Sequence, residues 1–171
     1  LPNYGVFDEK RVFKSGKKYN IINYKGVKLG LLICEDMWFN SLPLYLKKNG
    51  ANLFICINAS PYETGKFSKR KEIAQKLVQK TKVPLLYLNQ VGGQDELVFD
   101  GNSFLMDSKG NLSDKCYSWK EDYKVIKFPE YLINKKYKKN NLDYLYEFNT
   151  WSALTLGLRD YFFKNSFYKI V

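Results

Sequence analysis

Short apolar runs alternate along the chain with longer segments in which apolar residues recur at helical spacing. The apolar runs are Val27–Cys34, Ala51–Asn58 and Val83–Asn89, and runs of this length are typical of strands buried in a sheet. Ser41–Asn49 lies between the first two runs and carries the end signals of a short helix. Lys66–Lys82 separates the second run from the third and is predicted to form an amphipathic helix.

After the third run, the apolar segments become shorter and turn-forming residues become more frequent. Glu96–Phe99 and Ser103–Asp107 are predicted to form a hairpin that turns at Asp100 and Gly101. Tyr123–Phe128 is predicted to be a last strand. Strands that first alternate with helices and then follow one another directly predict an α/β layer architecture with a mixed sheet.

The last part of the chain has a different pattern. Asn134–Asn141 has no apolar residue except Tyr137 and is interpreted as a linker. Leu142–Lys164 is predicted to be helical, and Tyr168–Val171 is interpreted as the start of a new strand. We therefore expect one domain at residues 1–133, a linker at 134–141 and the beginning of a second domain at 142–171. Because the chain begins with Leu1 and ends on an apolar run, we expect it to be a fragment of a longer polypeptide.

Composition narrows the classes of function. The net charge is +11, but only three of the 28 basic residues are arginines, and the lysines are scattered along the chain. This distribution favours a solvated lysine surface over a nucleic-acid or membrane footprint. No run approaches the ~18 apolar residues of a membrane helix. We therefore expect neither nucleic acid nor membrane as a partner.

Histidine is absent, which excludes Ser-His-Asp and Cys-His catalysis and histidine metal ligands within these residues. Three cysteines without CxxC spacing argue against a disulfide scaffold and a zinc cluster, so we expect no metal site. Free cysteines are typical of a reducing compartment, which predicts a cytoplasmic protein.

Cys34 is the strongest candidate for chemistry. It follows the first predicted strand, and α/β folds place reactive groups at the carboxyl ends of strands. A thiol there can act as a nucleophile, and the next backbone N–H groups can stabilise an oxyanion. The alternative is a small buried apolar residue, as free cysteines often are. Cys56 is interpreted as a core residue, and Cys116 lies in a polar loop.

The segment after the second strand, NASPYETGK, is the second candidate. Ser60 offers a hydroxyl and Lys66 a cation, and together they could hold the α-carboxylate of a small amino acid. The alternative is a loop followed by a helix cap. Tyr4 and Glu9, taken alone, belong to a surface loop.

Four segments taken together resemble a known family in order and spacing. They are LPNYGVFDEKRVF, LLICEDMW, INASPYETGK and YLNQVGGQDELVFDGNSF. They resemble the glutaminase domain of glutamine-dependent NAD synthetases, which belongs to the nitrilase or carbon–nitrogen hydrolase superfamily. The tail WSALTLGLRDYFFKNSFYKIV resembles the start of the synthetase domain of the same family.

The resemblance implies a fold and a set of roles. The fold would be the C-terminal half of a nitrilase-type α-β-β-α sandwich, then a linker and the first helices of an adenine-nucleotide α-hydrolase-like synthetase domain. Cys34 would attack the glutamine amide and form a glutamyl thioester, while Tyr4, Ser60 and Lys66 would bind glutamine. Three more residues would support the pocket: Glu9, Glu35 and Trp38.

The resemblance also places two catalytic groups outside this sequence. The family's lysine and general-base glutamate would lie upstream of Leu1, so we expect the fragment alone to be inactive and to leave an apolar sheet face bare. The implied reaction is the ATP-dependent amidation of nicotinic acid adenine dinucleotide, with ATP and Mg²⁺ held by the synthetase domain, in a homo-oligomer. The alternatives are a stand-alone nitrilase-type amidase, a basic binding module and a degenerate pseudo-enzyme.

Overall fold

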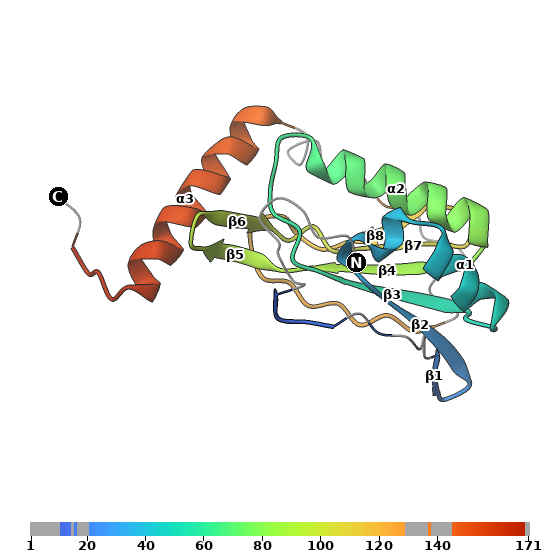
Figure 1. Ribbon diagram of the computed structural model, residues 1–171. Helices are drawn as coiled ribbons and strands as arrows, with labels where there is room; N and C mark the ends of the chain where they lie inside the picture. Colours follow the sequence, from blue (N-terminus) through green and yellow to red (C-terminus); the bar gives the residue numbers. More distant parts are fainter. Residues whose placement is uncertain (1–10, 15, 17–20, 129–136, 138–144, 170–171) are drawn as a thin grey trace.

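A computed structural model describes residues 11–14, 16, 21–128, 137 and 145–169. Its main feature is a six-stranded mixed sheet (Figure 1). The strands are β1 (Ile21–Tyr24), β2 (Val27–Ile33), β3 (Leu53–Asn58), β4 (Leu85–Asn89), β7 (Phe104–Met106) and β8 (Leu112–Lys115). They lie in the order β1-β2-β3-β4-β7-β8. The pairs β2–β3 and β3–β4 are parallel, and the other pairs are antiparallel.

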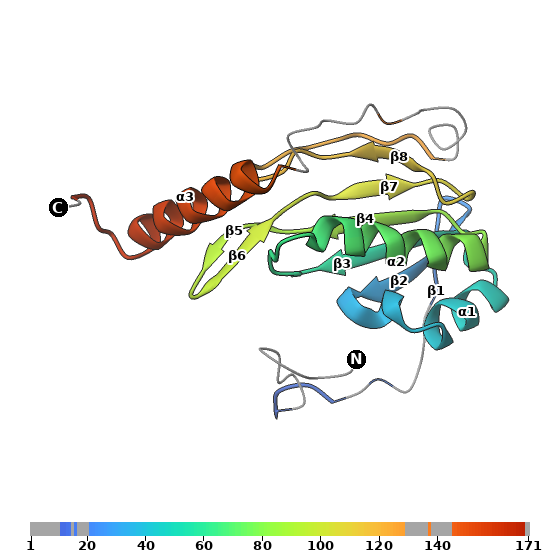
Figure 2. The same ribbon diagram turned by 90° about the horizontal axis from the view of Figure 1, so that it is seen from above.

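Two helices connect the parallel strands and cover one face of the sheet. They are α1 (Ser41–Lys48) and α2 (Lys66–Thr81), and both lie on the same side (Figures 1 and 2). The three apolar runs and the two intervening helices are thus confirmed. The core lies between this sheet face and the helices, and Phe54, Leu85 and Val78 are among its fully buried residues.

The opposite face of the central strands is apolar and exposed. Ile33, Ile57 and Leu88 are register neighbours on β2, β3 and β4, and all three are exposed. Successive strand residues point to opposite faces, so the buried Leu32 and Cys56 belong to the helix-covered side. Helices α1 and α2 therefore leave this apolar row uncovered.

The predicted hairpin around Asp100 and Gly101 is wrong. β6 (Leu97–Asp100) pairs with β5 (Val91–Gln94) in a separate two-stranded sheet, which we call the β5–β6 hairpin. Its turn falls at Asp95, which has a φ of 51°. The pair Gly92-Gly93 suggests a loop, but both residues lie within β5. β7 pairs instead with β4 and β8.

The last predicted strand is also wrong, because Tyr123–Phe128 contains no strand and its Tyr123 and Val125 are exposed. The outer position belongs to β8, whose inward residues are the polar Ser113 and Lys115. A strand with polar residues inside has no apolar alternation, so the sequence pattern does not reveal it. The pattern also misses β1.

The C-terminal helix α3 (Tyr146–Lys164) packs on the β5–β6 hairpin (Figure 2). This helix confirms most of the predicted helix at Leu142–Lys164. Residues 142–144 and nearly all of the predicted linker lie outside the described residues. The Gly93 N–H donates to Asp160 Oδ2 at 2.7 Å, and Lys164 Nζ donates to the Gly93 carbonyl at 2.7 Å. A Cβ on Gly93 would lie 3.1 Å from the Gly157 Cα, which is tighter than an ordinary Cβ contact, so this position favours glycine. No strand follows α3 up to Lys169, and the last two residues lie outside the described part.

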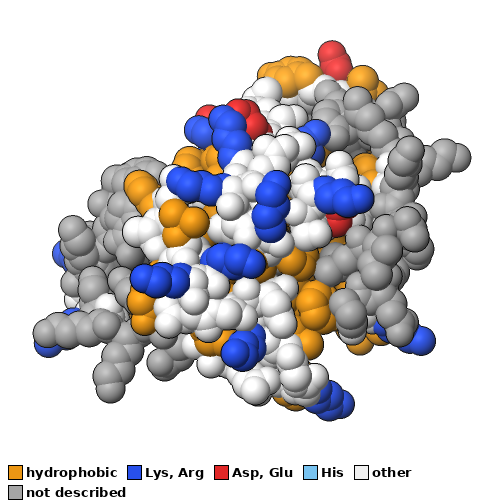
Figure 3. Space-filling model, turned by 90° about the vertical axis from the view of Figure 1, so that its right-hand side faces the viewer, with side chains coloured by type: hydrophobic (Ala, Val, Ile, Leu, Met, Phe, Trp, Pro, Cys, Tyr) orange, Lys and Arg blue, Asp and Glu red, His pale blue; other side chains and the backbone are white. Residues whose placement is uncertain are grey.

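The surface carries many lysines without one continuous patch on the face shown in Figure 3. There, Lys and Arg side chains are dispersed among uncharged and apolar ones. None of the helices in the described segments is long and apolar enough to cross a membrane.

Gly93→Ala is expected to weaken the docking of α3 by about 1–3 kcal/mol, because the new methyl group would meet the Gly157 backbone. Amide hydrogen exchange followed by mass spectrometry should show faster exchange in Tyr146–Lys164. Gly16→Ala is the matched control, since nothing lies within 4 Å of a Cβ there. Equal protection of α3 in both variants would contradict this packing.

Candidate functional site

Three polar residues mark the carboxyl ends of the parallel strands. Cys34 directly follows β2, and Asn58 and Asn89 are the last residues of β3 and β4. The register pairs Ile33 with Ile57 and Asn58 with Asn89, so the three positions lie level along one edge of the sheet. This is the edge at which parallel α/β sheets place their ligands.

Cys34 sits at a sharp turn of the backbone. It has a φ of 48° and begins the short 3-10 helix η2 (Cys34–Trp38). A non-glycine residue in this region is strained, and such strain is concentrated at functional sites. One hydrogen bond holds the turn, in which the Ile33 N–H donates to Asp36 Oδ2 at 2.9 Å. The buried Met37 side chain anchors the 3-10 helix in the core.

The remaining predicted residues near Cys34 are half-buried. Trp38 packs against the core, and Lys69 Nζ lies 5.3 Å from the centre of its ring. Glu35 is half-buried in the same 3-10 helix. Tyr4 and Glu9 lie outside the described residues.

The three cysteines differ in environment. Cys56 is buried in β3, and burial raises the pKa of its thiol to about 12, although a hydrogen bond with Asn58 acts in the opposite direction. Its interpretation as a core residue is confirmed. Burial also raises the pKa of Cys116, which is half-buried outside the strands. Cys34 is half-buried at the sheet edge.

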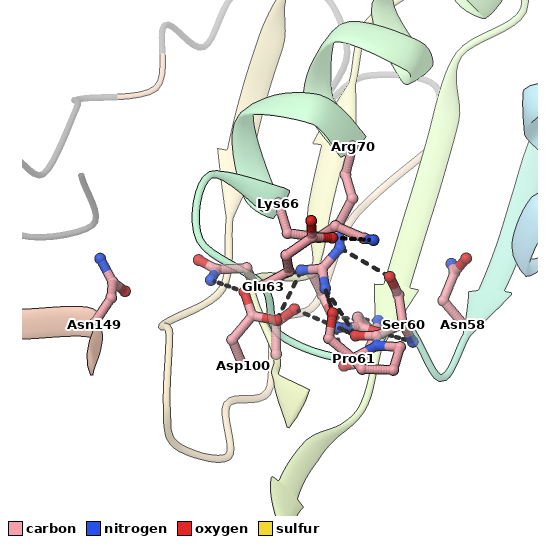
Figure 4. A network of polar contacts seen from close by, with 12 residues as sticks. Asn58, Ser60, Pro61, Glu63, Lys66, Arg70, Asp100 and Asn149 are labelled. Atoms are coloured by element: carbon pink, nitrogen blue, oxygen red, sulfur yellow. Dashed lines mark hydrogen bonds and ion pairs between the residues drawn. The ribbon is translucent and has the colours of Figure 1, made fainter. Parts of the chain in front are cut away.

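Ser60 lies in the loop between β3 and α2, where it contacts a buried arginine (Figure 4). Arg70 is 1% exposed, and its guanidinium donates five hydrogen bonds. Nε donates to Ser60 Oγ at 3.1 Å, and Nη2 donates to the carbonyls of Ser60 at 2.7 Å and Pro61 at 3.0 Å. Nη1 donates to Asp100 Oδ1 at 2.8 Å and to Oδ2 at 3.0 Å.

A second set of contacts holds the same loop from β4. The Ser60 N–H donates to Asn89 Oδ1 at 2.8 Å, and Asn89 Nδ2 donates to the carbonyls of Ser60 at 3.2 Å and Gly101 at 3.1 Å. Burial raises the pKa of the Tyr87 phenol, although the charge of Arg70 and a hydrogen bond with the Ser60 hydroxyl act in the opposite direction. The phenol therefore stays protonated.

The network continues to β8 through buried polar groups. Asn102 Nδ2 donates to Asp100 Oδ2 at 2.7 Å, and Lys115 Nζ donates to Asn102 Oδ1 at 2.7 Å. Among the described residues, no buried side-chain nitrogen or oxygen lacks a hydrogen-bond partner. The polar layer is therefore satisfied internally, as stable burial requires.

Lys66 is the first residue of α2 and lies closer to the surface than Ser60. Its Nζ is 2.8 Å from Glu63 Oε2, with the lysine side chain 19% exposed and the glutamate side chain 67% exposed. The Lys66 hydrogen bond and charge lower the pKa of Glu63. The structure thus places Ser60 in the loop after β3 and Lys66 at the start of α2, where that loop ends.

The sequence interpretation did not assign roles to Arg70, Asp100 or Asn89. One signal for Arg70 was available: it occupies the face of α2 that also carries Phe67, Ala74 and Leu77, all buried. A charged residue at an apolar position of an amphipathic helix indicates a buried partner. Asp100 and Asn89 had no comparable signal, because their role depends on how distant strands meet.

The described part of the chain contains no group of three His, Cys, Asp or Glu residues that could hold a metal ion.

Residues 1–132 match the model of the carbon–nitrogen hydrolase family. The chain belongs to this family. The α/β fold of carbon–nitrogen hydrolase type, predicted from the sequence, is thereby confirmed.

Two relatives of this carbon–nitrogen hydrolase are NAD synthetases. The glutamine-dependent NAD(+) synthetase of Acinetobacter baylyi is 39% identical over all of this chain and 32% of its own length. The structure of the glutamine-dependent NAD+ synthetase of Acinetobacter baumannii with ADP has a TM-score of 0.81 and 34% identity, covering 95% of this chain and 31% of that one. The resemblance found in the sequence is confirmed, and the chain spans about a third of these relatives.

A more distant structure is an amidase of Nesterenkonia sp. AN1, with a TM-score of 0.59 and 25% identity. The match covers 68% of this chain and 44% of that chain. That amidase carries the acetamide moiety of fluoroacetamide covalently added at its active-site cysteine.

Cys56 is expected to resist alkylation in the folded protein, whereas Cys34 reacts. At pH 8 the raised pKa of Cys56 reduces its thiolate by roughly a thousandfold, and its side chain is buried. Iodoacetamide labelling followed by peptide mass mapping measures both rates. Unfolding in urea should remove the difference, and labelling of Cys56 as fast as Cys34 in the folded protein would contradict the described core.

Proposed function

We propose that this chain is the glutaminase part of a glutamine-hydrolysing NAD synthetase, with Cys34 as the nucleophile. The observation that carries the proposal is the position of Cys34, at a strained turn on the edge where the Ser60 loop also begins. The similarity of the whole chain to glutamine-dependent NAD synthetases supports the choice of reaction. The complete enzyme would form NAD from nicotinic acid adenine dinucleotide, ATP and glutamine.

In the proposed reaction, the Cys34 sulfur attacks the side-chain amide carbon of glutamine. The carbon–nitrogen bond breaks, the nitrogen takes a proton and leaves as ammonia, and a glutamyl thioester remains on the sulfur. Water then cleaves the thioester to release glutamate and the free thiol. The Glu35 N–H would stabilise the oxyanion. The proton acceptor and the lysine that the family uses are assigned to no residue of this chain.

Substrate recognition would use the loop between β3 and α2. Ser60 and Lys66 would hold the α-carboxylate of glutamine, together with Tyr4, while Glu9, Glu35 and Trp38 would shape the pocket. The support for this is that Lys66 begins α2 directly after the loop that contains Ser60, and that the Lys66 side chain ends in a cation.

We further propose that residues 142–171 begin the synthetase domain, after the glutaminase domain at 1–133 and a linker at 134–141. The match to the family model ends at residue 132, whereas the NAD synthetases match the whole chain. ATP and Mg²⁺ would bind the synthetase domain outside this chain, and the complete protein would be a homo-oligomer.

A stand-alone amidase is the second candidate. The Nesterenkonia amidase, which carries an adduct on its active-site cysteine, favours amide chemistry on this fold. Such an enzyme would release ammonia from its amide without ATP or a dinucleotide, and it would give no NAD.

In the full-length enzyme, Cys34→Ala is expected to reduce glutamine-dependent NAD formation by about a thousandfold or more and to leave the ammonium-dependent reaction unchanged. The reason is that free ammonium bypasses the thioester. NAD formation is measured with glutamine and with ammonium in parallel.

Cys116→Ala is the matched control, because Cys116 is a half-buried cysteine outside the sheet edge, and it should keep both activities. Equal use of glutamine by the Cys34→Ala variant would reject Cys34 as the nucleophile. Ammonia release without NAD formation by the unaltered enzyme would favour the stand-alone amidase.

A further inference from the structure

The Arg70 side chain is almost completely buried, which is unusual for an arginine. Its side chain is 1% exposed and its partner Asp100 is 2% exposed. Guanidinium carries its donors in a rigid plane, and here it makes five hydrogen bonds, two with Asp100 and three with the loop. The side chain therefore joins the end of β6 to the loop after β3.

The three bonds to the loop fall on two successive residues. They fix the Ser60 hydroxyl, the Ser60 carbonyl and the Pro61 carbonyl at once. Because Nε–H occupies a lone pair of Ser60 Oγ, the hydroxyl hydrogen must point away from the guanidinium. The Ser60 hydroxyl also forms a hydrogen bond with Tyr87, so Arg70 and Tyr87 together set its orientation.

Arg70 also fixes the loop relative to Lys66. Residues four apart on a helix lie on the same side, one turn from each other, so Lys66 and Arg70 are neighbours on α2. The guanidinium holds Ser60 at one end of the loop, and the helix carries Lys66 at the other end (Figure 4). The separation between the Ser60 hydroxyl and the Lys66 ammonium therefore depends on Arg70.

We propose that Arg70, oriented by Asp100, is a positioning residue that presents Ser60 and Lys66 to the α-carboxylate of the substrate amino acid. This inference rests on the proposed function, because it concerns the substrate subsite of the same glutaminase reaction. Arg70 itself contacts no substrate and acts through the loop.

This position favours arginine because its planar guanidinium reaches Asp100 and the loop at Ser60 and Pro61 at the same time. A lysine keeps the positive charge beside Asp100 but cannot donate to Ser60 Oγ and to two carbonyls together. Arg70→Lys is thus the sharpest variant, since it separates the charge from the fork. Asp100→Asn is the second variant, since it keeps the shape of the partner and removes its charge.

The experiment measures kcat and KM for glutamine, and ammonium-dependent NAD formation, in the full-length enzyme. Arg70→Lys is expected to raise the glutamine KM about tenfold or more, with the ammonium reaction unchanged. Asp100→Asn should raise the KM in the same direction by a smaller factor. Ser60→Ala and the double variant complete a cycle, and the two changes should be less than additive if Arg70 acts through Ser60.

Val78→Ala is the control for loss of stability. Val78 is fully buried on the same helix and takes no part in the hydrogen bonds that Arg70 makes. It should lower thermal stability without changing the glutamine KM. A purely structural Arg70 would behave like Val78, with a loss of active enzyme in both the glutamine and the ammonium reactions.

The proposal is overturned if the glutamine KM of Arg70→Lys and of Asp100→Asn equals that of the unaltered enzyme. It is also overturned if both variants lose cooperative unfolding and ammonium-dependent activity, because Arg70 then serves the fold alone. The Cys34→Ala result separates this outcome from failure of the proposed function, since Cys34 can be the nucleophile whether or not Arg70 positions the loop.

Discussion

Burying the Arg70 guanidinium imposes the strictest condition on this structure. Moving a charged group out of water costs several kcal/mol, and the cost is offset only when its counter-charge and all its hydrogen bonds are in place. Here the partners come from two separate parts of the chain. Asp100 lies at the end of β6, and the Ser60 hydroxyl and two loop carbonyls follow β3. Arg70 itself lies on α2, a third part. These segments must converge in one arrangement, because any other would leave a buried charge without partners.

The condition explains why polar residues gather at one edge of an otherwise apolar sheet. Beneath the helices, Phe54, Leu85 and Val78 pack without polar groups. At the carboxyl ends of the strands, Asn58 and Asn89 donate to nearby backbone carbonyls, and Asp100 accepts from Arg70 and Asn102. The apolar core supplies most of the free energy of folding, whereas this polar edge selects the geometry of the loop that follows it.

The sequence was most informative where burial and periodicity agree. The parallel strands and α2 follow from apolar runs and a helical stripe, and Cys34 could be placed at a strand end for the same reason. The errors occur where polarity and burial disagree. β8 points Ser113 and Lys115 inward, and β5 includes Gly93, which packs tightly against α3. Local propensity cannot report a contact made by a residue 67 positions away, as in the bond from Gly93 to Asp160.

The β5–β6 hairpin connects the contacts of α3 with Gly93 to the ion pair of Asp100 and Arg70. Asp160 and Lys164 of α3 hold the backbone of Gly93 in β5, and Val91 pairs with Asp100 at the open end of the same hairpin. Asp100 in turn orients Arg70. A displacement of α3 must therefore either break its bonds to Gly93 or move the hairpin that carries Asp100. The loop that contains Ser60 is thus connected to α3 through the β5–β6 hairpin and the Asp100–Arg70 ion pair. The geometry of this loop therefore depends on how α3 packs on the hairpin.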